Sequence, residues 1–245
     1  MGRAVALAGI AALLGIAALP LGIGGRLEQA FARSVQTFSG SEDAQKEITL
    51  DHMDVYALQL GVFDSIDRAS AEVQRLEAMG VSCMIWQKER LRLIADVALT
   101  RDALDYSAAK GQDAYVISQA LDEVLLRIGA QADAVDAACA LVALPDETLL
   151  ALLDGSKSSD LIPGIRTAAD AARQAHPGHA LYTTLADNLL AWCDMMERPA
   201  YAGASGYGRA AMFALCRELR QALIAASTAS AQRTPSTAAD VIPPA

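Results

Sequence analysis

The pattern of hydrophobic and polar positions divides the chain into four parts: an apolar N-terminal run, a polar stretch, a segment of mixed strand and helix periodicity, and an alanine-rich helical region. Residues 4–23 are uncharged and mainly apolar. At roughly 1.5 Å per residue, such a helix spans the hydrocarbon core of a bilayer. We therefore predict an N-terminal membrane anchor over residues 1–25, with a cleaved signal peptide as the alternative.

Residues 26–52 are predicted to be a juxtamembrane linker, because Ser39–Asp43 is polar and typical of turns. Either N-terminal element exports the rest of the chain. The charge bias between Arg3 and Arg26 is weak, so the orientation depends on the domain that follows. The expected topology is a single-pass membrane protein with a cytoplasmic N-terminus and an extracytoplasmic bulk.

Residues 53–118 alternate strand and helix periodicities in the order βαββαβ. Period-two alternation predicts strands over residues 55–63, 81–87, 91–98 and 113–118. Helical spacing predicts one helix that begins after Asp64 or Ser65 and ends at Gly80, and a shorter one over 101–110. The predicted fold class is α+β, a ferredoxin-like split fold with both helices on one sheet face and the other face open.

Alternation also assigns side chains to the two faces of this sheet. Those expected under the helices are Leu58, Leu60, Cys83, Ile85, Leu93, Ala95 and Val97. Those expected on the open face are Ala57, Gln59, Gly61, Phe63, Met84, Trp86, Arg92, Ile94 and Asp96. Aromatic rings stack on sugar faces, while amide and guanidinium groups hydrogen-bond sugar hydroxyls. The open face therefore suits a polysaccharide, unless Trp86 and Phe63 are packing residues shielded by another domain.

The first half of this segment resembles a SPOR domain, a small module that binds the glycan strands of peptidoglycan. SPOR domains open with Tyr-x-x-Gln-x-Gly-x-Phe and continue into an alanine-containing helix that ends in glycine. The matching residues here are Tyr56, Gln59, Gly61, Phe63, Ala69, Ala71 and Gly80. The third strand of the family carries an aromatic-x-Arg pattern followed by Gly-Pro. Arg92 matches that arginine, whereas Arg90 replaces the aromatic residue and Asp96-Val97 replaces Gly-Pro.

The resemblance implies a peptidoglycan-binding protein of the septum, in cell division or sporulation. No cofactor and no catalytic residue is expected, because no acid/base or metal set is visible in the chain. The residues expected to bind glycan, from the resemblance and the predicted open face together, are Gln59, Gly61, Phe63, Trp86, Arg92 and Ile94. The alternative is that a degenerate SPOR fold serves, with the helical region, as a platform for protein partners.

Residues 119–230 are alanine-rich and are predicted to form four or five antiparallel helices. Apolar residues recur at helical spacing from Leu121 to Leu141. Prolines and glycines are expected to separate further helices near 146–153, 165–176, 179–197 and 207–228. The expected core contains Trp192, Leu189, Leu190, Met212, Phe213 and Leu215. The remaining residues, 231–245, are predicted to be a disordered tail.

Charge argues against a nucleic-acid partner. The net charge is −9 and the pI is near 4.8, whereas duplex binding depends on Lys and Arg neutralising phosphates. The same topology occurs in RNA-binding RRM modules, but these need stacked aromatic residues on the third strand, and Leu91–Val97 has none.

Metal and catalytic motifs are not visible in the chain. His52, His176 and His179 form no pair at i, i+4 around a glutamate. We predict that His176 and His179 are solvated imidazoles in a helix–helix turn. The four cysteines each lie in apolar segments, which favours buried free thiols. A disulfide among Cys139, Cys193 and Cys216 remains an open alternative.

Overall fold

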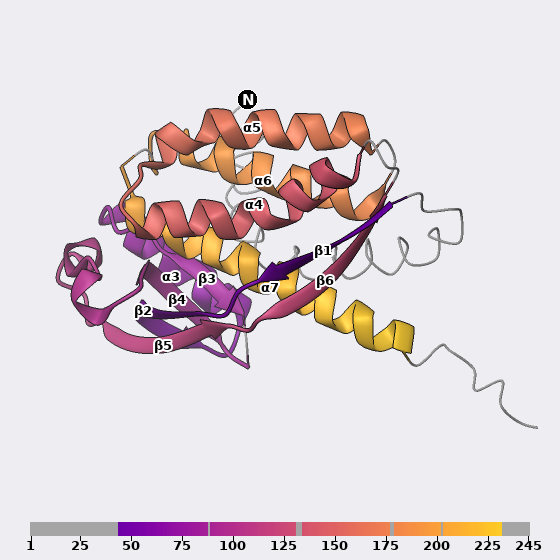
Figure 1. Ribbon diagram of the computed structural model, residues 1–245. Helices are drawn as coiled ribbons and strands as arrows, with labels where there is room; N and C mark the ends of the chain where they lie inside the picture. The colour runs from indigo at the N-terminus through magenta and orange to yellow at the C-terminus, as the bar shows by residue number, and fades with distance from the viewer. Residues whose placement is uncertain (1–43, 88, 131–133, 177–178, 202, 232–245) are drawn as a thin grey trace, which may run out of the picture.

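Two antiparallel sheets and five helices make up the computed structural model, which describes residues 44–231 except 88, 131–133, 177–178 and 202 (Figure 1). The predicted α+β class is confirmed. Most of the predicted linker, the anchor over residues 1–25 and residues 232–245 of the predicted tail lie outside the described residues. Within the described ranges, no helix has the length and apolar character needed to cross a membrane.

The larger sheet has four strands. They are β2 (Met53–Phe63), β3 (Met84–Gln87), β4 (Leu91–Ala98) and β5 (Tyr115–Leu121). Their order across the sheet is β3-β4-β2-β5, and every neighbouring pair is antiparallel. All four predicted strands are present, and β4 has the predicted bounds.

Helix α3 (Ile66–Ala78) covers one face of this sheet. Ser65 caps its first turn by accepting a hydrogen bond from the backbone N–H of Arg68, at 3.4 Å. The chain leaves the helix through Gly80, whose φ of +76° suits a residue without Cβ. The apolar stripe of α3 packs on the buried sheet residues in a small core. This core includes Ala69, Val73, Leu76, Leu58, Ile85 and Leu93. This half of the predicted unit is confirmed.

The predicted second helix over residues 101–110 is wrong. Two short 3₁₀ helices, η1 (Arg101–Ala103) and η2 (Tyr106–Ala109), take its place. The backbone N–H of Asp105 donates to the Asp96 carboxylate at 2.8 Å, and the Asp105 carboxylate accepts from the N–H of Ser107 at 2.9 Å. Because these side-chain bonds compete with α-helical ones, the segment forms separate turns.

A second sheet pairs β1 (Ala44–Leu50) with β6 (Val124–Ala130). Strand β1 leads directly into β2, and β5 leads into β6 (Figure 1). The segment that contains β1 and β2 therefore runs beside the segment that contains β5 and β6 through both sheets. The predictions of a linker at residues 44–50 and of helix at 119–130 are therefore wrong. The apolar spacing of 121–128 fits a helix, but pairing between distant segments overrides that local pattern.

Four helices follow: α4 (Val135–Leu153), α5 (Ser158–Ala175), α6 (Ala180–Met196) and α7 (Ser205–Ala231). Of the predicted core residues all but Leu190 are fully buried, and Leu190 packs partly buried against them. Pro145 and Pro163, expected to separate helices, lie inside α4 and α5. A proline there removes one helical hydrogen bond, and tertiary packing of apolar faces provides most of a helix's stability.

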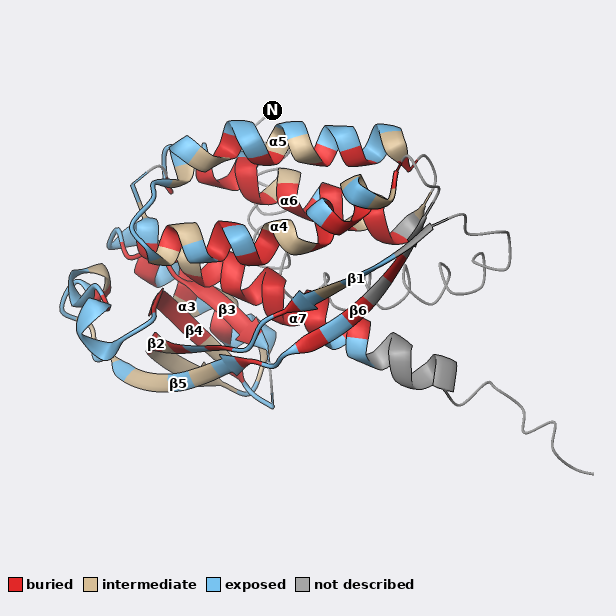
Figure 2. Ribbon diagram, viewed as in Figure 1, coloured by how far each residue is buried: buried red, intermediate tan, exposed pale blue. Residues whose placement is uncertain are grey.

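The layers run from α3 through the four-stranded sheet to α7, then to α4 and α6, and finally to α5. Helix α7 crosses the sheet face opposite to α3, mainly over β4 and β3. Figure 2 shows continuous burial from this face into the helices, and one large core spans both, from Val55 and Ile94 to Phe213 and Leu185. The prediction of an open sheet face is therefore wrong, because the chain's own last helix covers it.

Candidate functional site

Two irregularities in the pairing of β2 with β4 change which predicted site residues share a face. Gln59 pairs with Ile94, but Gly61 pairs with Leu93, so Leu60 is an extra residue on β2. On the other side of Gln59, Leu58 pairs with Asp96, which leaves Ala95 extra on β4. Each such bulge reverses the alternation for the residues that follow it.

The six predicted glycan-binding residues consequently lie on two faces. Gln59, Trp86, Arg92 and Ile94 are on the α7 face, whereas Gly61 and Phe63 pair with Leu93 and Leu91 of the α3-side core. The Phe63 ring lies over Gly61, where a Cβ would stand 2.8 Å from the ring. The prediction of one shared face is wrong. The bulge in β4 likewise moves Val97, expected under α3, into the core on the α7 side.

Trp86 packs against α7 and hydrogen-bonds it. Its side chain is 1% exposed, and its indole N–H donates to the carbonyl of Ala210 at 3.2 Å. Its ring stacks on Phe213 with centroids 4.8 Å apart, and the guanidinium carbon of Arg217 lies 5.3 Å from the ring centroid. The ring face and the indole N–H, which would bind a sugar, are thus both occupied by contacts with α7.

Gln59 and Arg92 form a hydrogen bond with each other. The Arg92 guanidinium donates from Nη1 to Gln59 Oε1 at 2.5 Å, and Gln59 is 7% exposed. Ile94 is fully buried. Of the four predicted site residues on the α7 face, only Arg92 remains partly accessible to a ligand.

Asp96, which stands where the resemblance expects glycine, fixes the beginning of α7. Its buried carboxylate accepts from Arg209 Nη2 at 2.7 Å and from the backbone N–H of Val97 at 2.7 Å, besides that of Asp105. Burial raises the pKa of Asp96, and Arg209 opposes that rise. Gly206 touches this strand so closely that a Cβ would lie 2.7 Å from the carbonyl oxygen of Ala95.

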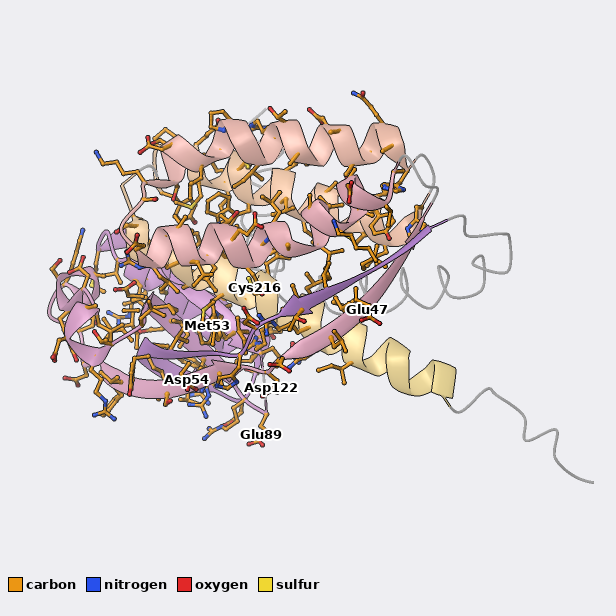
Figure 3. The ribbon with its side chains drawn as sticks, in the orientation of Figure 1. Glu47, Met53, Asp54, Glu89, Asp122 and Cys216 are labelled. Atoms are coloured by element: carbon orange, nitrogen blue, oxygen red, sulfur yellow. The ribbon has the colours of Figure 1, made fainter. Side chains whose placement is uncertain are left out.

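Arg220 fills the break between the two sheets. It donates to the carbonyl of Leu50 at 3.3 Å, to the carbonyl of Asp122 and to the buried carboxylate of Asp146. Figure 3 shows Asp122 at the junction of β5 and β6 and Cys216 on α7. Burial raises the pKa of Asp146, and Arg220 opposes that rise. Sequence reasoning missed these α7 contacts. The available signal was a set of arginines inside an apolar helix: Arg209, Arg217 and Arg220.

A cavity of about 460 Å³ opens at the end of β2 and at the β3–β4 turn. It is lined by Phe63, Asp64, Ile66, Gln87, Glu89, Arg90 and Leu91. Arg90 and Asp64 form an ion pair across it at 2.7 Å. This cavity combines an aromatic ring with polar and charged groups beside a predicted site residue. A second cavity, of about 710 Å³, lies between the ends of α4, α5 and α6 and the start of α7.

The histidines and cysteines have structural surroundings. His176 and His179 flank the α5–α6 turn as predicted. The predicted solvation of both rings is wrong, because His176 is buried with Nε2 3.0 Å from the carbonyl of Ala134, and both ring nitrogens of His179 are buried as well. Burial and the neighbouring His176 lower the pKa of His179 to about 4. The four cysteines are buried free thiols, as predicted. Among the residues described, no three His, Cys, Asp or Glu side chains are placed to hold a metal ion.

In comparisons with known proteins, no family model, no curated protein and no solved structure matches the chain.

Proposed function

We propose that this chain is an interaction protein of the cell envelope, in which a degenerate SPOR-like unit and its helical bundle together form a platform for protein partners. The observation that carries this proposal is the environment of Trp86, which is 1% exposed and donates its N–H to Ala210 on α7. A ring that would stack on a sugar is here used for packing. The chain acts by binding, without catalysis or a cofactor.

Two features support the SPOR-like part of the proposal. The strand order β3-β4-β2-β5, with α3 between β2 and β3, supports a ferredoxin-like split fold in which η1 and η2 stand in place of the second helix. The motif residues Tyr56, Gln59, Gly61 and Phe63 all lie on β2. The apolar run over residues 4–23 supports anchoring in a membrane with the described residues outside the cytoplasm.

The test compares protein capture with glycan binding. The detergent-solubilised full chain is cross-linked in envelope extracts and, separately, sedimented with purified sacculi before and after amidase removal of stem peptides. We expect a defined protein to be captured at stoichiometric yield, and sacculi to retain no more of the chain than of an unrelated anchored protein. Sedimentation that rises after stem-peptide removal, without protein capture, would refute the platform function.

Binding of septal glycan strands is the second candidate, and the cavity beside Phe63 is the observation that favours it. Phe63 and Arg90 both line this cavity and remain at least partly exposed. If glycan binds there, Phe63→Ala and Arg90→Ala should each reduce sacculus sedimentation several-fold, because each loses a stacking or hydrogen-bonding group. Arg68→Ala, on the exposed surface of α3, is the matched control. Equal sedimentation of all three variants would exclude this site.

A further inference from the structure

Strand β5 leaves one edge of the larger sheet unpaired by any described strand. On its inner side it pairs with β2 without a bulge, from Met53 opposite Leu121 to Gln59 opposite Tyr115. On its outer side no described element continues the sheet, and Figure 1 shows β5 at the margin of the molecule. Alternate backbone N–H and C=O groups of β5 therefore face solvent, ready to pair with a further strand.

The sequence of β5 lacks the residues that usually prevent an exposed edge strand from pairing with another strand. Tyr115–Leu121 contains no charged residue, no proline and no glycine. The opposite edge of the sheet differs, because β3 has only four residues and Arg217 of α7 donates to the carbonyl of Gln87 there.

Both faces of β5 keep apolar surface that an added strand would cover. Val116 packs only partly buried on the α3 side, and Ile117 only partly buried on the α7 side. Tyr115 is 64% exposed at the beginning of the strand. Cross-strand contacts with such residues are the unit of sheet stabilisation, so an added strand gains both backbone hydrogen bonds and side-chain packing.

Charge indicates what kind of strand fits. Exposed acidic residues flank the uncharged strand at both ends: Asp113 precedes it, and Asp122 and Glu123 follow it. A second copy of the chain fits poorly, because antiparallel self-pairing centred on Ser118 places Asp113 of one copy opposite Glu123 of the other. A partner strand with an apolar centre and Lys or Arg at both ends is complementary.

We propose that β5 binds an extended, basic-ended segment of a partner protein by antiparallel strand addition. This inference rests on the proposed function as an interaction platform and assigns the surface through which the platform works. The recognition has two parts: the edge hydrogen bonds supply affinity, and the flanking carboxylates select the charge of the partner's ends.

The test uses two synthetic heptapeptides with the same alternating Val/Thr centre, one ending in Lys at both ends and one in Glu. At low salt the full chain should bind the Lys-ended peptide about tenfold more tightly, with a difference that shrinks as salt is added. Hydrogen exchange should slow at the amides of β5 when that peptide binds. The triple variant Asp113→Lys, Asp122→Lys, Glu123→Lys should reverse the preference.

The matched control carries Glu147→Lys, Asp154→Lys and Asp160→Lys, three exposed acids on or beside α4 and α5. It has the same net charge as the test variant and should keep the preference for the Lys-ended peptide. Thermal unfolding of both variants checks that they fold. Equal affinities for the two peptides, protection away from β5, or reversal by the control variant would overturn the proposal. If the full chain shows no preference for the Lys-ended peptide but still captures a protein, β5 is not the binding site, but the proposed platform function is retained.

Discussion

At the scale of single residues, arginines on α7 connect that helix to the sheet and to the buried carboxylates of Asp96 and Asp146. Arg209 reaches Asp96 with Nη2 and Oδ1 2.7 Å apart, and the two side chains are 15% and 0% exposed. The Asp96 charge is fully removed from water, so it depends on Arg209 and on the backbone N–H groups around it. The ion pair formed by Arg166 with Asp194 and Glu197 is by contrast exposed to solvent.

We expect Arg209→Met to lower the free energy of unfolding by about 3–5 kcal/mol, because it leaves Asp96 as an unpaired buried carboxylate. Arg166→Met, the control, should cost at most about 1 kcal/mol. Urea denaturation measures both. The double variant Asp96→Asn, Arg209→Met should cost less than the sum of its single changes. Equal losses for Arg209 and Arg166 would show that the Asp96 pair contributes little.

His179 should make stability depend on pH. Its pKa is lowered from 6.5 to about 4 by burial and by His176, so the unfolded chain binds a proton more readily than the folded one. The stability it contributes is complete above about pH 6.5 and is lost as pH falls towards 4. We expect the Tm to fall between pH 7 and pH 5, and His179→Gln to reduce that fall.

His52→Gln is the matched control, because it also removes one histidine, from a side chain that is 51% exposed. It should leave the Tm at pH 7 unchanged. The buried Asp96 and Asp146 have raised pKa values and work in the opposite sense, which favours folding at low pH. Comparing each variant with the parent at both pH values separates His179 from them. A fall in Tm between pH 7 and pH 5 that is as large in His179→Gln as in the parent protein would show that His179 is not its cause.

At the scale of elements, α7 is held between two tryptophans. Trp86 from the sheet donates its N–H to Ala210, and Trp192 from α6 donates to the carbonyl of Gly208 at 3.3 Å. Phe213, which is fully buried, stacks on Trp86. The helix therefore links the sheet to the helical bundle through large side chains on two of its sides.

Phe213→Ala should destabilise the protein by about 3–5 kcal/mol, because it opens a cavity beside Trp86. Leu150 on α4 is 48% exposed, so Leu150→Ala should change the free energy of unfolding by about 0.5 kcal/mol or less. Chemical denaturation followed by far-UV circular dichroism measures both. A red shift of tryptophan emission in folded Phe213→Ala would place the change at the helix–sheet contact. Similar losses in the two variants would mean that α7 is not a principal contact.

At the scale of the whole molecule, the sheet and the bundle share one core that runs from Val55 and Trp86 to Leu185 and Trp192. We expect a single cooperative unfolding transition, since neither part can expose its side of that core alone. Tryptophan fluorescence and far-UV circular dichroism should give the same midpoint in urea. Two separated midpoints would show that the four-stranded sheet with α3 and the helices α4–α7 unfold independently.

Local sequence was sufficient for much of the fold. The alternation at Leu91–Ala98 predicts β4 with its observed bounds, and Ser65 and Gly80 mark the ends of α3. These features depend on short-range preferences: side chains alternate along a strand, hydroxyls cap helices, and glycine accepts a positive φ. The core residues Trp192 and Phe213 follow from helical spacing in the same way.

The candidate site followed from local patterns only in part. Gln59, Trp86, Arg92 and Ile94 share a face as alternation predicts, but Leu60 is bulged and turns Gly61 and Phe63 away from them. A bulge is set by how two strands pair, which alternation in either strand alone does not show. The resemblance at Tyr56–Phe63 accordingly predicts the residues of β2 better than their directions.

Tertiary packing settled the features that bear most on function. The covering of the sheet by α7 depends on contacts between residues more than 110 positions apart, such as Asp96 with Arg209 and Trp86 with Ala210. The pairing of β1 with β6 likewise joins segments whose own sequences suggest a linker and a helix. Periodicity along the chain shows which side of an element is buried. Which element covers that side depends on complementarity of shape and charge between distant segments. The strands could therefore be predicted from the sequence, but the covering of the sheet by α7 could not.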